Sequence, residues 1–142
     1  MASDGAEANR KSAGPGIRGG STSGPDISGD GRYVTFDSIA SNLAADDTNT
    51  CSYTPGGQYF PEPGECPGVF VRDLQDGTTT RASVSMAGEQ ADDASTDPAI
   101  STDGRIVVFF TTASFALDDT NTCPPFFFSH PGQCPDIYLH SR

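Results

Sequence analysis

The 142-residue chain has no Trp, only 2 His, and 8 Lys and Arg against 19 Asp and Glu. Its net charge of −11 argues against nucleic acid as a partner, because the phosphates would be repelled. No apolar run is long enough to cross a bilayer, so membrane insertion is not expected. No stretch shows sustained helical periodicity, which argues against a helical fold.

The sequence also lacks the motifs of common catalytic sites. It contains no Gly-x-Ser-x-Gly elbow, no phosphate-binding loop and no HExxH sequence. We therefore expect a protein that is not an enzyme.

What the sequence does contain is an internal repeat. Residues 46–51 and 118–123 both read Asp-Asp-Thr-Asn-Thr-Cys. Each copy follows an Asp-Gly pair and an apolar run, and each precedes a Pro-rich loop, a second Cys-Pro and another short apolar run. A repeat of this kind predicts two copies of one structural unit.

The expected fold is all-β, because Gly and Pro are abundant and Asp-Gly pairs at residues 30–31, 76–77 and 103–104 predict tight hairpins. We expect two consecutive four-stranded antiparallel units, the second of which lacks its outer strand. The predicted strands are residues 26–28, 32–38, 69–74 and 78–85, then 98–101, 105–112 and 136–140. Residues 106–110 are apolar on both faces, as in a sheet that is covered on both sides.

These strands predict a division of the chain into four parts. Residues 1–24 form a Gly- and Ser-rich leader or strand-exchange segment, 25–85 the first repeat, 86–97 a connecting loop, and 98–142 an incomplete second repeat. The leader is not unrelated to the repeats, because residues 3–9 parallel residues 86–92 in sequence.

The four cysteines fall in two pairs, each of which brackets a Pro-rich loop. Two local disulfides, Cys51 with Cys66 and Cys123 with Cys134, are the economical interpretation, and they indicate a secreted or cell-surface protein. Zinc is the alternative. Close CxxC spacing is missing, and His130 and His140 are not regularly placed around the cysteines, which disfavours a zinc site.

The order of these motifs resembles the TolB-like β-propeller repeats of bacterial extracellular proteins. The matching stretches include Asp-Ile-Ser-Gly-Asp-Gly-Arg-Tyr-Val-Thr-Phe at residues 26–36, Val-Phe-Val-Arg-Asp at 69–73 and Gly-Thr-Thr-Thr-Arg-Ala-Ser-Val at 77–84. The resemblance implies propeller blades, of which this chain would supply nearly two. The cysteine-bounded insertions depart from the usual repeat.

The repeated acidic motif also predicts a calcium site, since Ca²⁺ prefers carboxylate and amide oxygens. In the second copy the expected ligands are Asp119, Asn121 and Asp136, with Asp118 as an additional one. The first copy offers Asp47 and Asn49 but has Gly68 where the second has Asp136, so its site would be weaker. The alternative is that these side chains cap turns.

A second candidate site is aromatic. Phe126, Phe127 and Phe128 are consecutive in one cysteine-bounded loop, and Tyr59 and Phe60 lie in the other. Exposed aromatic clusters often mark a contact surface. The alternative is that these rings fold back over the edge of a sheet.

An isolated pair of such units leaves sheet faces and edge strands exposed, and such edges pair with other chains. We expect a non-enzymatic extracellular assembly module that associates with copies of itself, in a closed ring or a filament. The alternative function is a ligand-binding propeller module, for glycan or protein, within a larger secreted protein.

Overall fold

A computed structural model describes residues 1–10, 12, 24–45, 47–48, 66–115, 134 and 136–142. These residues form two antiparallel sheets and no helix. The first sheet, unit 1, has the strand order β1 (Asp26–Ile27), β2 (Tyr33–Ser38), β3 (Gly68–Asp73) and β4 (Thr78–Arg81). The second sheet, unit 2, has the order β5 (Ser95–Ile100), β6 (Ile106–Thr111) and β7 (Asp136–Ser141).

The all-β prediction is confirmed, including sheets of four and three strands. Two strand ends differ from the prediction by more than one residue. β5 begins at Ser95 rather than residue 98 and contains a bulge between Thr96 and Ala99, where Asp97 adopts a positive φ of 56°. β4 ends at Arg81 because the backbone N–H of Val69 turns to the hydroxyl of Ser83 instead of a strand partner.

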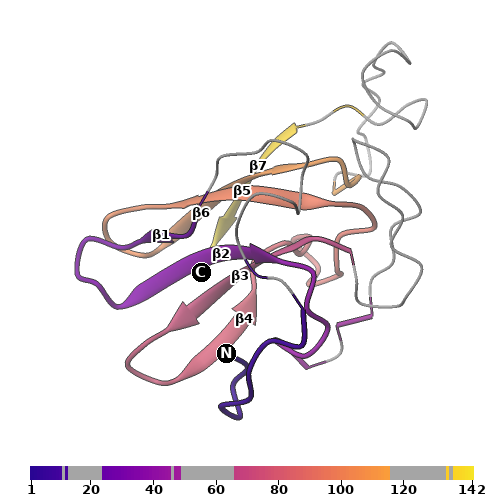
Figure 1. Ribbon diagram of the computed structural model, residues 1–142. Coiled ribbons are helices and arrows are strands. Elements are labelled where there is room, and N and C mark those ends of the chain that lie inside the picture. The colour runs from indigo at the N-terminus through magenta and orange to yellow at the C-terminus, as the bar shows by residue number, and fades with distance from the viewer. Residues whose placement is uncertain (11, 13–23, 46, 49–65, 116–133, 135) are drawn as a thin grey trace.

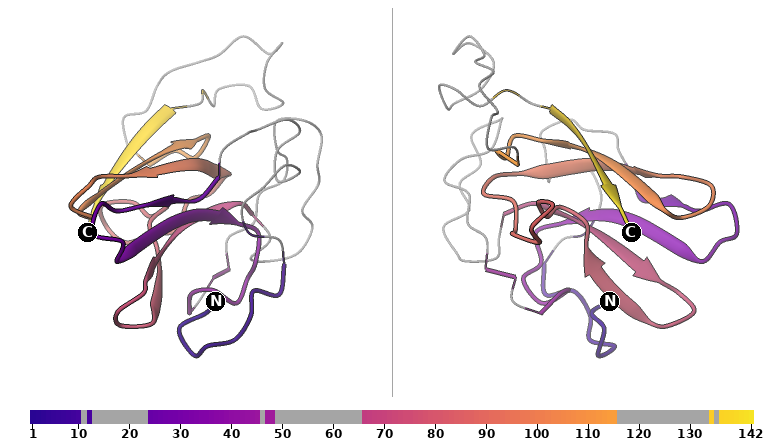
Figure 2. Two further views of the ribbon diagram at one scale, coloured as in Figure 1. Left: turned by 60° about the vertical axis from the view of Figure 1, so that its left-hand side comes forward. Right: turned by 180° about the vertical axis from the view of Figure 1, so that it is seen from behind.

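The two sheets are stacked as layers, and they are seen as two separate layers in all three views (Figure 1, Figure 2). Val69 and Val71 of β3 pack against Val107 and Phe109 of β6, and all four side chains are at most 1% exposed. Burying an aliphatic or Phe side chain stabilises a fold by about 1.5–3 kcal/mol. This shared apolar cluster therefore contributes to the cohesion between the units.

Backbone hydrogen bonds fix the position of unit 2 on unit 1. Gly29 N donates to Thr102 O at 2.9 Å, and Ser95 N donates to Pro67 O at 2.9 Å. The carboxylate of Asp26 in β1 accepts a 2.9 Å hydrogen bond from Ile100 N in β5. These bonds join edges of both sheets, so the stacking has one register.

The leader and the inter-unit loop occupy equivalent places. Ser12 pairs with Ser38 as Ser95 pairs with Thr111, with 2.9 Å between the hydroxyl oxygens in each pair. Likewise, the side chain of Asn9 accepts from Ser41 N at 3.1 Å, and that of Asp92 accepts from Ser114 N at 3.1 Å. The sequence parallel between the two segments therefore extends to their hydrogen bonds.

Gly104 is expected to be more sensitive to substitution than its counterpart Gly31. Both have a positive φ, 71° and 73°, but a Cβ on Gly104 would overlap the Tyr33 ring, whereas Gly31 has nothing within 4 Å. We expect Gly31→Ala to cost about 1–2 kcal/mol from backbone strain and Gly104→Ala about 1–3 kcal/mol more from overpacking. Urea unfolding measures both, and equal losses would contradict the packing argument.

Candidate functional site

The two faces of unit 2 have different surroundings. Side chains alternate along a strand, so Val107 and Phe109 face unit 1 while Ile106 and Val108 point away from it. Leu139 of β7 lies opposite Val108, and Ile137 shares its face. We call these four residues the unit 2 outer face. Ile106, Leu139 and Ile137 are 39%, 56% and 73% exposed.

The same face of unit 1 is buried. By sequence equivalence, Ile106, Val108, Ile137 and Leu139 correspond to Tyr33, Thr35, Val69 and Val71. Thr35 and the two valines are at most 1% exposed, because unit 2 covers them. The unit 2 outer face is thus the bare counterpart of a surface that is covered within the molecule.

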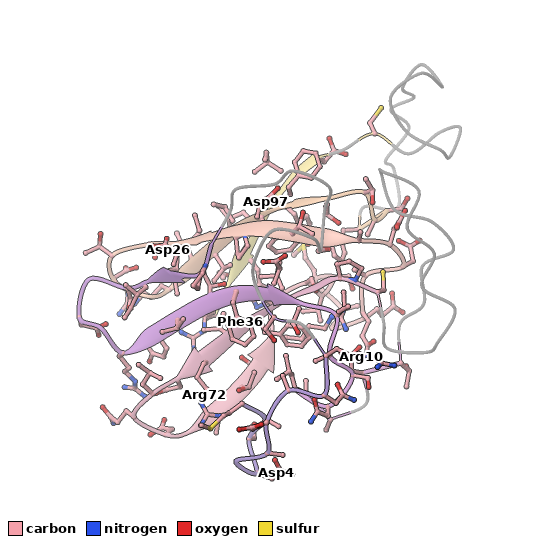
Figure 3. The ribbon with its side chains drawn as sticks, in the orientation of Figure 1. Asp4, Arg10, Asp26, Phe36, Arg72 and Asp97 are labelled. Carbon is pink, nitrogen blue, oxygen red and sulfur yellow. The ribbon has the colours of Figure 1, made fainter. Side chains whose placement is uncertain are left out.

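Unit 1 also exposes a counterpart of the unit 2 face that covers Val69 and Val71. Ile27, Val34 and Phe36, the unit 1 outer face, correspond to Ile100, Val107 and Phe109 of unit 2. Phe36 is labelled in Figure 3. Ile27 is 53% exposed, and the other two are partly buried. The ring pair Phe36–Phe70, 6.0 Å between centroids, matches Phe109–Tyr138 at 5.6 Å. Both halves of the inter-sheet contact are therefore present a second time on the outside.

The outer edge of unit 2 borders a groove. Among the described residues, β7 pairs with β6 on one side and with no strand on the other. The groove has a volume of about 540 Å³ and is lined by Tyr138, Leu139, His140 and Ser141 together with Ser85 and Met86. Met86 is 99% exposed. Burial lowers the pKa of His140, and the nearby Arg142 lowers it further.

Unit 1 holds a buried ion pair at the predicted cation site. Arg81 Nη1 donates to Asp47 Oδ1 at 2.5 Å, and the two side chains are 5% and 1% exposed. Burial lowers the pKa of Arg81 and raises that of Asp47, while each charge opposes the shift of the other. The carboxylate predicted to bind calcium thus contacts a guanidinium.

The other predicted calcium ligands are only partly within the described residues. Asp136 begins β7, whereas Asn49, Asp118, Asp119 and Asn121 lie outside the described residues. Within the described ranges, no group of three or more His, Cys, Asp or Glu side chains is placed to hold a metal ion. Calcium binding stays a prediction.

The cysteines and aromatic loops divide in the same way. Cys66 and Cys134 are both disulfide-bonded. Their predicted partners Cys51 and Cys123, and the predicted contact residues Tyr59, Phe60, Phe126, Phe127 and Phe128, lie outside the described residues. The pairing of the cysteines and the aromatic contact surface stay predictions.

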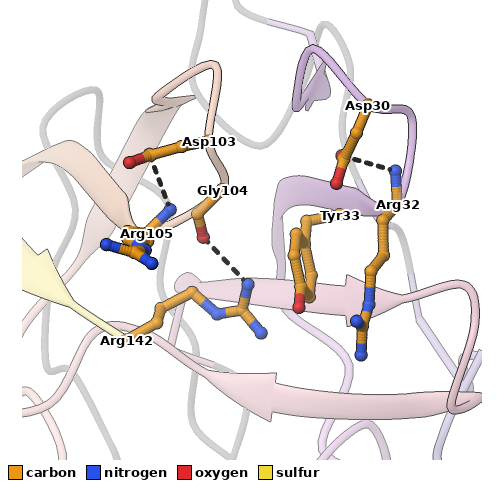
Figure 4. A pocket seen from close by; sticks show the side chains of 7 residues that line it. All are labelled: Asp30, Arg32, Tyr33, Asp103, Gly104, Arg105 and Arg142. Carbon is orange, nitrogen blue, oxygen red and sulfur yellow. Dashed lines mark hydrogen bonds between the residues drawn. The ribbon is translucent and has the colours of Figure 1, made fainter.

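A polar pocket lies between the β1–β2 and β5–β6 hairpins (Figure 4). Arg142 lies over the Tyr33 ring at 3.9 Å and donates to Gly104 O at 3.0 Å. Arg32 donates to Asp73 at 2.7 Å and to Asp76 at 2.9 Å. Arg105 corresponds to Arg32, but Ser141 stands at the position of Asp73. The pocket offers charged hydrogen-bond donors and acceptors.

The sequence indicated some of these features and missed others. The apolar run at residues 106–110 predicted a sheet covered on both faces, but in β6 only Val107, Phe109 and Thr111 are buried and the other face is exposed or half-buried. Arg81 was not recognised as the partner of Asp47, because the two are 34 residues apart and a solvated arginine is the ordinary expectation. A signal existed, since Arg81 is a lone cation in a Thr-rich strand.

Arg81→Met is expected to destabilise unit 1 by about 3–5 kcal/mol, because it leaves the buried Asp47 carboxylate without its counter-charge. The double variant Arg81→Met/Asp47→Leu should recover most of this loss. Urea unfolding followed by circular dichroism measures both. Arg105→Met, at an exposed arginine, is the control and should change stability by less than about 0.5 kcal/mol. A double variant no more stable than Arg81→Met would contradict the ion-pair argument.

Acid unfolding should depend on Asp73. Hydrogen bonds from Arg32, then from the backbone N–H groups of Asp76 and Gln75, hold the Asp73 pKa well below its usual range. A carboxyl with a lowered folded-state pKa stabilises the fold above its unfolded pKa, about 3.9, and loses that contribution as the pH falls further. Asp73→Asn should therefore flatten the decline of melting temperature below about pH 4. An unchanged slope would contradict this assignment.

Comparisons with known proteins identify no relative, so the residues themselves are the evidence for function. A scan against protein-family models finds no match, and searches of curated proteins and of solved structures find none either. The described residues contain no helix long and apolar enough to cross a membrane.

Proposed function

We propose that the chain is a non-enzymatic structural module that associates with copies of itself. The unit 2 outer face of one copy docks on the unit 1 outer face of the next. One observation carries this proposal: the same interface exists once inside the molecule, between units 1 and 2, and both of its halves recur outside.

The geometry of the repeat supports this pairing at a second position. Gly104 of unit 2 packs directly on Tyr33 of unit 1. Its counterpart Gly31 has nothing within 4 Å, and Ile106, the counterpart of Tyr33, is 39% exposed. Docking of a second copy brings Gly31 onto Ile106 and completes the same contact.

The two docking surfaces differ from each other, so the association is heterologous. Heterologous contacts give a closed ring when the rotation between copies closes, and an open filament when it does not. The resemblance to TolB-like propeller repeats favours a ring of blades, and the same contacts with a different twist give a filament. Exposed apolar residues at Ile106, Ile137 and Leu139 supply the surface that such contacts bury.

The chemistry of the chain favours an extracellular setting. Disulfide-bonded Cys66 and Cys134 are typical of oxidising compartments. Calcium bound by the repeated acidic motif would add stability in the same setting.

Ile137→Glu is expected to abolish self-association, because it places a charge in the centre of the proposed contact. Light scattering over a concentration series measures the mass of the particle. Ile27→Glu, on the complementary surface, should have the same effect. Leu74→Glu is the matched control, since Leu74 is 55% exposed but lies in the β3–β4 turn.

Two results would overturn the proposal. One is a wild-type protein that stays monomeric at every concentration. The other is an Ile137→Glu variant that associates as strongly as wild type. A mass that increases in wild type and Leu74→Glu, and stays monomeric in Ile27→Glu and Ile137→Glu, supports it.

A further inference from the structure

In unit 1, the fourth strand occupies a slot between β3 and the start of the chain. Thr79 of β4 donates its N–H to Ser3 Oγ at 2.9 Å and its hydroxyl to Met1 O at 2.6 Å. On its other side β4 pairs antiparallel with β3, and the hydroxyl of Thr79 also accepts a 3.2 Å hydrogen bond from Arg72 of β3. β4 is therefore held on both sides.

Unit 2 has both walls of this slot. Residues 84–86 correspond to residues 1–3, and Tyr138, Leu139, His140 and Ser141 correspond to the four residues of β3 that pair with β4. Ser85, Met86 and these four residues are the lining of the groove of about 540 Å³. The groove thus has the place and the walls of the slot that holds β4 in unit 1.

The backbone of β7 is oriented to accept a strand there. In unit 1, Ala82 N donates to Val69 O, so Val69 turns its backbone groups toward β4. Backbone groups alternate in direction along a strand, so Val71 does the same. Ile137 and Leu139 are the counterparts of these two valines, and their backbone groups face the groove.

The side chains of unit 2 favour an arginine in the incoming strand. Arg81 is paired with Phe70, with its guanidinium 5.5 Å from the ring centroid, and a Cβ on Gly68 would lie 2.5 Å from Arg81 Nη2. The counterparts in unit 2 are Tyr138 and Asp136. An arginine in this register contacts the Tyr138 ring, as Arg81 contacts Phe70. It also contacts the Asp136 carboxylate, where unit 1 has only Gly68.

We propose that the groove along β7 is a strand-acceptor site for an extended segment of the β4 type, Thr-Thr-Thr-Arg, supplied by another repeat. The segment pairs antiparallel to β7 with its arginine opposite Tyr138 and directed at Asp136, and it covers Met86. The inference rests on the proposed function in treating unit 2 as completed by another repeat, but it requires no docking of the outer faces.

A synthetic peptide tests the site directly. Fluorescein-labelled Gly-Thr-Thr-Thr-Arg-Ala-Ser-Val, the sequence of residues 77–84, is titrated with the full chain and followed by anisotropy. We expect saturable binding. Binding should be lost when proline replaces the third Thr, because this residue pairs with Val71 in unit 1 and would pair with Leu139 here, and proline has no backbone N–H to donate. Gln in place of Arg should weaken binding by about twofold to fivefold.

The location is tested on both partners. Asp136→Asn should weaken binding of the Arg peptide by a similar factor and leave the Gln peptide unaffected, with Glu89→Gln as the control for loss of one carboxylate. A benzophenone at the second Thr of the peptide should cross-link to residues 84–86, the counterparts of residues 1–3, which contact Thr79 in unit 1. Cross-links to Met1 or Arg72 would mean that the peptide has displaced β4, and would overturn the proposal.

A tethered version keeps the test decisive if the free peptide binds weakly. Arg142 corresponds to Leu74, so residues Gln-Asp-Gly-Thr-Thr-Thr-Arg-Ala-Ser appended after Arg142 repeat the natural hairpin. We expect the melting temperature to increase by at least about 3 °C relative to the same extension with proline at the third Thr. Equal melting temperatures, together with no peptide binding, would overturn the proposal.

Both measurements are repeated in the Ile137→Glu background. The Ile137 side chain is on the opposite face from Tyr138, so this variant removes outer-face docking without changing the side of the groove that receives the arginine. Strand binding in a monomeric variant supports the acceptor site even if the proposed self-association fails. Absence of strand binding in both backgrounds, while the wild-type chain self-associates, overturns the acceptor site alone.

Discussion

The contact between the two sheets is the constraint on which the rest of the structure depends. Val69 and Val71 meet Val107 and Phe109 in a surface from which water is excluded. Because strands alternate their side chains, this one contact decides which residues of every strand face inward. It also divides each sheet into a covered face and an outer one, and the outer faces are where the proposed assembly takes place.

The hydrogen bonds between the units hold the two sheets in the position that the apolar contact requires. Asp26, Gly29 and Ser95 tie sheet edges together and fix the register of the stack. Apolar contact alone is not directional, so these polar bonds choose one arrangement among several that would bury similar area. A repeat that docks on itself needs such a register, because only a fixed step between units gives a regular assembly.

The buried Asp47–Arg81 pair shows how a fourth strand contributes more than backbone pairing. In unit 1 the strand delivers a guanidinium to a carboxylate that water does not reach. Such a pair stabilises little compared with an apolar substitute, but a missing partner is costly. The pair therefore makes unit 1 depend on the arginine of its fourth strand, and in the proposed acceptor site Asp136 has the same role toward an incoming arginine.

Much of the fold was predictable from the sequence, and the reason is local. Asp-Gly hairpins and the short strand-forming runs at 33–38 and 106–111 depend on neighbours within a few residues, and all seven strands were expected close to where they lie. The early start of β5 was missed because its bulge depends on pairing with β6. The partner of Asp47 was missed because it is brought near only by the β3–β4 hairpin.

The sequence by itself determined that the chain repeats, that it is all-β, and that its second unit has one strand fewer. Those properties follow from residue order and short-range geometry. Only the tertiary structure decided that the two units stack face to face, that Ile137 and Leu139 are exposed where Val69 and Val71 are buried, and that a groove replaces β4. Burial is a property of what lies across a sheet, and no stretch of sequence specifies that alone.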